Sequence, residues 1–217
     1  MAELPSTIAL FPLPNFVFFP DVSAPLHVFE PRYREMIADV SAGSGIIGMT
    51  MLKGEWETDY YGAPDIFEVG CAGKISTLAR LTDGRYNLML DGISEFRVVR
   101  ETHEKAYRIA EVEWIPAPTD QLELSAEQTS QLRNLFVQCV GGSANDLWRS
   151  LVEEKGLHGA ALINFLCFHL DVFPIEKQTL LESGVNRGNC LIDVLTFKAQ
   201  ERKLGPGRKG GGSAPLQ

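Results

Sequence analysis

The stretch IALFPLPNFVFFPDVSAPLHVFEPRYREM, residues 8–36, sets the fold because its patterning changes from strand to helix. Its first apolar run predicts a leading strand that ends at Leu13. Pro31 suits the first position of a helix, since its missing N–H would have no helical partner there. Gly43 then ends a series of apolar residues at helical spacings of three and four. We therefore expect one helix against a sheet, with an apolar stripe at Tyr33, Met36, Ile37 and Val40.

Short β-type runs fill the rest of the chain up to Pro118. Asp83-Gly84, between two of these runs, supplies the positive φ angles of a tight hairpin turn. Asp91-Gly92 indicates either another turn or a bulge. Several short antiparallel strands imply a barrel or a sandwich. The runs are Ile46–Leu52, Ile66–Leu81, Tyr86–Leu90, Phe96–Arg100 and Tyr107–Ile115.

Helix formers replace the β-type runs after Pro118. A capping box of Ser125 and Gln128 precedes an apolar stripe that stops at Gly141. The segment from Gly159 to Leu170 is apolar on nearly every side, so it suits a helix at the centre of a small bundle. Further helices are expected to begin at Ser143, Pro174 and Asn186.

These patterns divide the chain into two lobes and a tail. We predict a β-rich lobe at residues 1–118, because the prolines around residue 118 break the strand pattern. A helical bundle is expected at residues 119–204. The remaining residues, 205–217, are rich in Gly and Pro with almost nothing to bury, so we predict that they are disordered. The fold class is therefore α+β.

The composition is that of an ordinary soluble protein. Hydrophobic residues make up 45% and charged residues 22% of the 217 residues, close to globular averages. No Lys or Arg precedes Arg32, which argues against a secretion signal. The longest near-apolar stretch, residues 160–170, is about half of the roughly 20 residues that a membrane-spanning helix needs. The four cysteines are scattered without metal-ligand spacing, so we expect reduced thiols, a cytoplasmic location, no metal and no membrane contact.

A second ordered pattern makes a family resemblance specific. The first part is DIFEVGCAGKI, residues 65–75, and a hairpin separates it from Leu88-Met89-Leu90-Asp91-Gly92. Together with residues 8–36, this order resembles the amino-terminal substrate-recognition domain of Lon proteases. The resemblance covers residues 8–116 well and continues more loosely through the helices. It implies a PUA-like β pseudo-barrel followed by a C-terminal α-helical bundle.

The sequence departs from that family pattern at one position. Many Lon relatives carry Arg three residues after the glycine equivalent to Gly92, whereas this chain has Glu95 there and Arg97 two positions later. Any contact that the family's arginine makes is therefore in doubt for this chain.

The residues argue for recognition rather than for catalysis. Lon enzymes continue into an ATPase and a serine protease, but the sequence contains no G-x-x-x-x-G-K-[ST] phosphate loop. A cysteine and histidine pair would need hydrogen-bond proximity, and Cys167 and His169 point to different faces of their expected helix. We therefore expect no enzyme activity and no cofactor. The resemblance implies a binding module for unfolded or tagged polypeptide or for a protein partner.

Five aromatic residues are candidate peptide contacts. Trp56, Tyr60 and Tyr61 lie among acidic residues outside any clear apolar periodicity, so they are either packed onto the barrel or exposed as anchors. Phe16 and Phe18 pose the same question, since alternating neighbours in a strand cannot all face the core. Packing is the simpler interpretation for each of them.

An RNA-binding protein is the alternative function, because PUA-like folds also occur in that class. Residues 1–118 contain 10 Lys and Arg against 17 Asp and Glu. Phosphate binding requires a basic face, so this acidic balance argues against nucleic acid as the partner. The same lobe can still contain a local basic patch within its acidic total.

Overall fold

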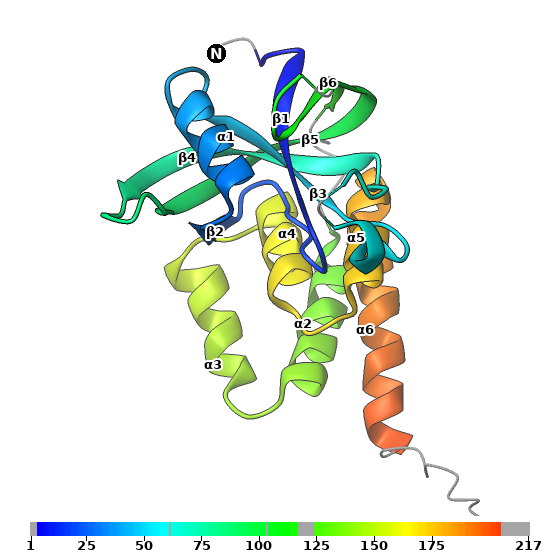
Figure 1. Cartoon of the computed structure of the whole chain (residues 1–217). Helices are drawn as coiled ribbons and strands as arrows, with labels where there is room; N and C mark the ends of the chain where they lie inside the picture. Colours follow the sequence, from blue (N-terminus) through cyan, green and yellow to red (C-terminus); the bar gives the residue numbers. More distant parts are fainter. Residues whose placement is uncertain (1–3, 61, 103, 117–123, 205–217) are drawn as a thin grey trace, which may run out of the picture.

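The computed structural model describes residues 4–60, 62–102, 104–116 and 124–204 of the chain. A β-rich lobe and a helical lobe pack directly on each other, with the long helix α6 (Arg187–Leu204) running away from the sheet (Figure 1). The predicted α+β class is thereby confirmed. The predicted lobe boundary at residue 118, the predicted disordered tail and Tyr61 lie outside the described residues.

Six strands of the described chain form one sheet in the order β2-β5-β4-β3-β1-β6. A further pairing of β5 with β6 closes five of them into a barrel and leaves β2 as an added strand beside β5. The pairing of β1 with β3 is parallel, and the others are antiparallel. The strands are β1 (Thr7–Leu13), β2 (Ser23–Val28), β3 (Ile46–Met51), β4 (Val69–Arg80), β5 (Tyr86–Thr102) and β6 (Arg108–Ile115).

Both faces of the barrel sheet carry buried side chains. One face lines the interior with a small cluster that includes Leu10, Phe96 and Val112. The opposite face, with Phe11 and Met49, packs on the helices and joins the large core that spans both lobes. Because each face is covered, every residue of β3 is buried and the strand does not show the alternation of a half-exposed sheet.

The hairpin and bulge signals in the sequence mark real features. Gly84 adopts a φ of +83° in the turn between β4 and β5, as the Asp83-Gly84 signal predicts. The runs predicted at Tyr86–Leu90 and Phe96–Arg100 form one strand, β5. The register shift opposite Ala72 and Gly73 shows that Asp91-Gly92 precedes a bulge rather than a turn.

Helix α1 (Pro31–Ser41) covers the sheet as expected, with Tyr33, Met36 and Ile37 buried. The capping box of Ser125 and Gln128 is present at the start of α2. The helix expected from Ser143 becomes a π-helical turn at Ser150–Glu154. The helices of the bundle are α2 (Ala126–Val140), α3 (Ala144–Arg149), α4 (Gly159–His169), α5 (Pro174–Glu182) and α6.

The segment between β1 and β2 forms an aromatic contact between the lobes. The rings of Phe16 and Phe18 stack with centroids 6.0 Å apart, and Phe168 of α4 meets both rings edge-on at 5.9 and 6.1 Å. Phe18 is 1% exposed. The phenylalanines between β1 and β2 therefore hold α4 against the sheet.

A buried charged residue joins the lobes a second time. Arg187, at the start of α6, is 1% exposed and donates to Glu95 Oε1 of β5 at 2.5 Å. Its other donors bond Asn164 Oδ1 of α4 at 2.6 Å and the carbonyl oxygens of Leu180 and Leu181 at 2.9 and 2.8 Å. One guanidinium therefore links three helices of the bundle to the barrel.

The side chain of Gln178 forms a second polar contact between the two lobes. Gln178 of α5 is 1% exposed, and its Nε2 donates to the carbonyl oxygen of Val69 in β4 at 3.0 Å. The same nitrogen bonds Glu182 Oε1 at 2.8 Å. The lobes thus share satisfied buried polar groups as well as apolar contacts, which fixes their relative position.

Gly92 should tolerate no side chain. A Cβ atom at Gly92 would lie 2.1 Å from the carbonyl oxygen of Phe19, and backbone cannot move aside as a side chain can. We expect Gly92→Ala to lower the free energy of unfolding by at least about 1 to 3 kcal/mol, measured by urea denaturation.

Gly43→Ala is the matched control, because its nearest atoms would be 3.8 Å away and its φ is not positive. Its free energy of unfolding should stay within about 1 kcal/mol of the parent. Equal stability of the two variants would contradict the close approach at Gly92.

Candidate functional site

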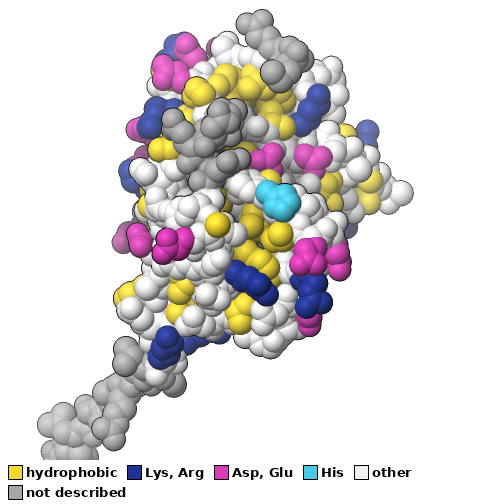
Figure 2. Space-filling model, turned by 180° about the vertical axis from the view of Figure 1, so that it is seen from behind, with side chains coloured by type: hydrophobic (Ala, Val, Ile, Leu, Met, Phe, Trp, Pro, Cys, Tyr) yellow, Lys and Arg dark blue, Asp and Glu magenta, His cyan; other side chains and the backbone are white. Residues whose placement is uncertain are grey.

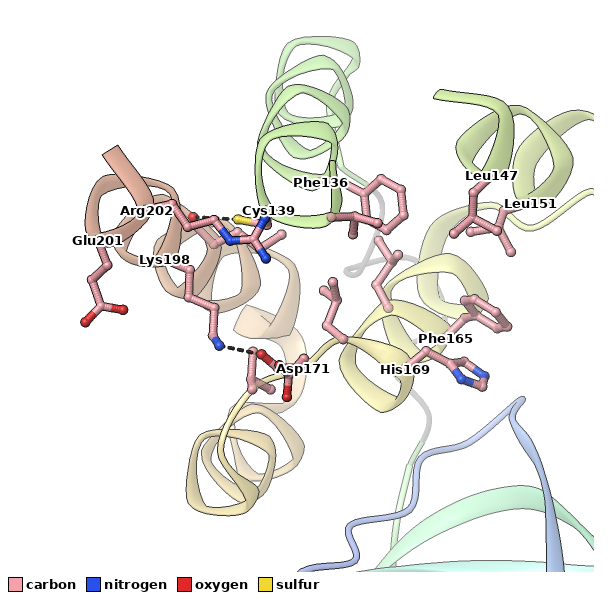
Figure 3. Close-up of a pocket in the computed structure, with 15 residues that line it drawn as sticks. Phe136, Cys139, Leu147, Leu151, Phe165, His169, Asp171, Lys198, Glu201 and Arg202 are labelled. Carbon is pink, nitrogen blue, oxygen red and sulfur yellow. Dashed lines mark hydrogen bonds between the residues drawn. The ribbon is translucent and has the colours of Figure 1, made fainter. Parts of the chain in front are cut away.

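The bundle contains a groove of about 820 Å³ between α2, α3, α4 and α6 (Figure 3). Apolar side chains dominate its lining, and the volume falls in the range of pockets that hold ligands. The lining residues are Phe136, Cys139, Val140, Leu147, Leu151, Phe165, Leu166, His169, Leu170, Asp171, Val172, Leu195, Lys198, Glu201 and Arg202.

The groove exists because the helices around it expose part of their apolar surface. The predicted stripe of α2 includes Phe136 and Cys139, and Val140 extends it toward solvent at 42% exposure. Leu147 of α3 is 44% exposed on the other side. In Figure 2, hydrophobic side chains reach the surface of the helical half between acidic and basic ones. Such clustered exposed apolar groups are typical of binding surfaces.

Charged residues of α6 border the groove. Lys198 donates to the carbonyl oxygen of Asp171, and Arg202 donates to that of Gln138 at 3.4 Å. Glu201 points away from the other labelled side chains (Figure 3). The two basic side chains are thus anchored to backbone at the rim while the interior of the groove stays apolar.

His169 borders the groove in its uncharged form at neutral pH. Partial burial, together with the charges of Lys177 and Lys155, holds the pKa of His169 below its ordinary value of about 6.5. Its ring lies 4.2 Å from that of Phe165. The neutral imidazole therefore adds to the apolar wall, and protonation at acid pH would place a charge there.

The thiols are arranged for packing rather than for chemistry. Burial raises the pKa of Cys167 to about 12 and that of Cys71 well above its ordinary value. Burial also raises the pKa of Cys139, whose Sγ lies 3.4 Å from the carbonyl oxygen of Leu195. A nucleophilic cysteine needs a stabilised thiolate, and these environments disfavour it. All four cysteines are free thiols.

The described ranges also lack a metal cluster and a membrane-spanning helix. Within residues 4–60, 62–102, 104–116 and 124–204, no three His, Cys, Asp or Glu side chains gather as a metal site. Across the same ranges, each helix is too short or too polar to cross a bilayer. His27 is a β2 residue whose Nδ1 lies 2.6 Å from Asn87 Oδ1, so this histidine has a hydrogen-bond partner.

The candidate aromatic residues Trp56 and Tyr60 lie beside the start of α1. Their positions in the sequence are far from those of the groove residues. Trp56 is half-buried in a short helical turn, and its ring contacts that of Tyr60 with centroids 5.9 Å apart. The Tyr60 hydroxyl donates to Glu30 Oε1 at 2.7 Å, and the Arg32 guanidinium lies 5.1 Å from the Tyr60 ring. Both rings are therefore held in place, and both keep part of their surface in solvent.

The structure changes the interpretation of Phe18. Its side chain is buried against Phe16 and Phe168, so the native conformation leaves almost none of it for a peptide. The extended segment turns this ring toward α4 because the bundle covers that face of the sheet. Phe16 is partly exposed and belongs to the same contact.

The groove residues were not anticipated from the sequence. The sequence predicts one apolar stripe on α2, and only Val140, next to Cys139, widens it beyond one face. Leu147 is a single leucine in a six-residue helix. The exposed concave surface arises from four helices together, so its sequence signal is limited to these two extra apolar positions.

A family model matches the pattern of barrel and bundle just described. It is the ATP-dependent protease La (LON) substrate-binding domain, and it matches residues 7–195. The chain belongs to this family. The resemblance recognised in the sequence is thereby confirmed.

Full-length relatives of this Lon substrate-binding domain are Lon proteases. Lon protease 2 of Myxococcus xanthus is 26% identical over 217 residues, covering 93% of this chain and 25% of the relative. The Lon protease of Desulfosudis oleivorans is 32% identical over 187 residues, covering 83% of this chain and 22% of the relative. The chain thus spans about a quarter of the length of these relatives.

Solved structures share the fold of the Lon substrate-binding domain. A Lon N-terminal domain protein from Xanthomonas campestris superposes with a TM-score of 0.65 at 22% identity, over 89% of this chain and 99% of that chain. The N-terminal domain of Mycobacterium avium complex Lon protease superposes with a TM-score of 0.66 at 16% identity, over 90% and 98%. The order of barrel and bundle is therefore common to these domains.

The thiols of the Lon domain should differ in reactivity. Cys190 is the most accessible of the four, whereas Cys71 and Cys167 are fully buried with raised pKa values. We expect iodoacetamide near pH 8 to modify Cys190 first and the two buried cysteines only on unfolding. Mass spectrometry of proteolytic fragments identifies the sites, and urea-unfolded protein is the control. Rapid modification of Cys167 in the folded protein would contradict its burial.

Proposed function

We propose that this Lon-type domain is a non-catalytic binding module that recognises apolar segments of unfolded or tagged polypeptide through the groove of its bundle. The observation that carries the proposal is the apolar lining of the 820 Å³ groove, with Val140 and Leu147 exposed at its margins. An extended chain can place one or two apolar side chains there. Lys198 and Arg202 lie at the rim, where their N–H groups could also donate to carbonyl groups of a bound peptide.

The expected affinity suits a receptor for many clients. Fully burying a Leu, Val or Phe side chain contributes about 1.5 to 3 kcal/mol. Two such side chains therefore supply only a few kcal/mol before the cost of association is subtracted. Weak binding of many apolar segments, rather than tight binding of one sequence, follows from this balance.

Trp56 and Tyr60 are proposed as a second contact for the same client. Their rings are partly exposed, and the hydrogen bond from Tyr60 to Glu30 holds that ring in position. Rigid aromatic side chains lose little conformational entropy on binding, which makes them efficient anchors. Tyr61 belongs to the same proposal, although it lies outside the described residues.

The proposal includes no reaction. The family match concerns the substrate-binding part of Lon, and the chain spans about a quarter of the full-length relatives. The raised pKa values of Cys71 and Cys167 also disfavour a thiolate nucleophile. Recognition of polypeptide is the role that the groove supports best.

A charge placed in the groove should impair client binding. Leu147 is 44% exposed, so Leu147→Asp should leave the fold intact while making the groove unfavourable for an apolar segment. We expect the dissociation constant for an apolar peptide chosen from an array to rise at least about tenfold. Fluorescence anisotropy of the labelled peptide measures it, with a urea melt to confirm folding.

The matched control is Val99→Asp on β5, where a valine 53% exposed lies on the other lobe. Its peptide affinity should equal that of the parent. Equal affinities of the Leu147→Asp and Val99→Asp variants, or silence of the parent toward every peptide on the array, would refute binding through the groove.

A further inference from the structure

The outer half of β4 has a partner on only one side. Strand β3 pairs with β4 up to Lys74, whereas β5 continues the pairing as far as Arg80. The β4 and β5 hairpin consequently extends beyond the barrel (Figure 1). Each residue from Ser76 to Arg80 is exposed. Lys74 still pairs with Ile46, and the Ile75 N–H donates to the carbonyl oxygen of Gly45 at 2.8 Å, so the open edge begins at Ser76. We call residues 76–80 the β4 edge.

The hydrogen-bond register identifies which backbone groups face outward from this edge. Leu81 donates to the carbonyl oxygen of Arg85 at 2.8 Å, so this pair is hydrogen-bonded. Antiparallel pairs alternate between bonded and non-bonded, which makes the pairs of Arg80 with Tyr86 and of Leu78 with Leu88 non-bonded. The N–H and C=O groups of Leu78 and Arg80 therefore point away from β5, toward the open side of the β4 edge.

The side chains beside these groups form an incomplete apolar row. Leu26 of β2, Leu88 of β5 and Leu78 of β4 lie opposite one another across three strands. Leu88 is buried, whereas Leu78, at the end of the row, is 40% exposed. An additional strand would place an apolar side chain next to Leu78 and continue the row.

Charge favours an acidic occupant. The β4 edge contains Arg80 and no acidic residue. Arg80 lies two residues from Leu78, so both side chains are on the same face of the strand. Among the described residues, Arg80 forms no ion pair. An acidic client residue two positions from the one beside Leu78 would therefore lie next to Arg80.

The opposite border of the sheet is closed to the same interaction. Strand β2 pairs with β5 on one side, and Pro25 lies in the middle of β2 without an N–H to donate. Proline is a common way to block an exposed edge. The β4 edge has no proline.

We propose that the β4 edge binds an extended client segment as an added antiparallel strand, with a preference for segments that place an apolar residue beside Leu78 and an acidic residue two positions away, beside Arg80. Backbone hydrogen bonds to Leu78 and Arg80 supply the affinity, and the place beside Leu78 selects the apolar side chains. This inference rests on the proposed polypeptide recognition and adds a further site, separate from the groove of the bundle and from Trp56 and Tyr60.

The test uses an eight-residue peptide with both ends capped, in which threonine alternates with valine or glutamate so that one face carries valine and glutamate in turn. Client residues that bond Leu78 and Arg80 have their side chains on the same face as these two residues, so the valines and glutamates should supply the bonding N–H groups. N-methylation of the central valine and the central glutamate should weaken binding at least about tenfold, since it removes these bonds. N-methylation of the two central threonines should leave the affinity within about threefold, because their N–H groups face solvent. Equal effects of the two modifications would overturn the proposal.

Variants of the protein test the same bonds from the other side. Leu78→Pro removes one outward N–H while the bonds to β5 remain, and Leu78→Ala keeps that N–H. We expect the proline variant to lose far more affinity than the alanine variant, with a melt to verify folding. If the proline variant fails to fold, the N-methylated peptides still test whether these backbone hydrogen bonds form.

The Leu147→Asp variant separates this inference from the groove. It should bind the alternating peptide as the parent does, even if no apolar peptide ever binds the groove. Loss of the alternating peptide in that variant would overturn a separate edge site. A dimer of the parent that Leu78→Pro dissociates would also overturn it, because a second copy would then occupy the edge.

Discussion

The guanidinium of Arg187 is the interaction on which the arrangement of the two lobes depends. An ionised side chain that is 1% exposed is costly unless its donors are satisfied, and here they reach a carboxylate, an amide and two carbonyl groups. These partners come from β5, α4 and α5. The charge can therefore be buried only when barrel and bundle are assembled together.

This constraint positions the candidate binding surfaces. Arg187 begins α6, and the far half of the same helix supplies Leu195, Lys198 and Arg202 to the groove. Asn164 ties α4, another wall of the groove, to the same guanidinium. The aromatic contact of Phe16 and Phe18 with Phe168 holds the same face of α4 one turn further along the helix. A groove that binds weakly and broadly still needs rigid walls, and the lobe contact provides them.

Local signals in the sequence were sufficient for much of the fold. The hairpin at Gly84, the helix opened by Pro31 and the capping box at Ser125 each depend on a few neighbouring residues. Glu95 shows the limit of such reasoning. It departs from the family pattern, and its partner Arg187 is 92 residues away in the sequence. Only the folded chain shows that the carboxylate belongs to a buried ion pair.

The binding surfaces were harder to predict for the same physical reason. Phe18 and Trp56 look alike in sequence as aromatics in irregular segments, yet α4 covers the first and leaves the second partly exposed. The groove needs four helices, and the β4 edge depends on where β3 stops pairing. Each of these features depends on which distant segment of the chain packs beside it. Periodicity and composition do not encode that information.

A double-mutant cycle between Arg187 and Glu95 tests the central claim most directly. Urea denaturation would give the free energies of unfolding of Arg187→Met, Glu95→Leu and the double variant. Each single change should cost about 3 to 5 kcal/mol, because it leaves the other charge buried without its partner. The double variant should cost well below the sum of the two, by more than about 1 kcal/mol. Costs that add within about 0.5 kcal/mol would contradict an energetic link between the lobes through this pair.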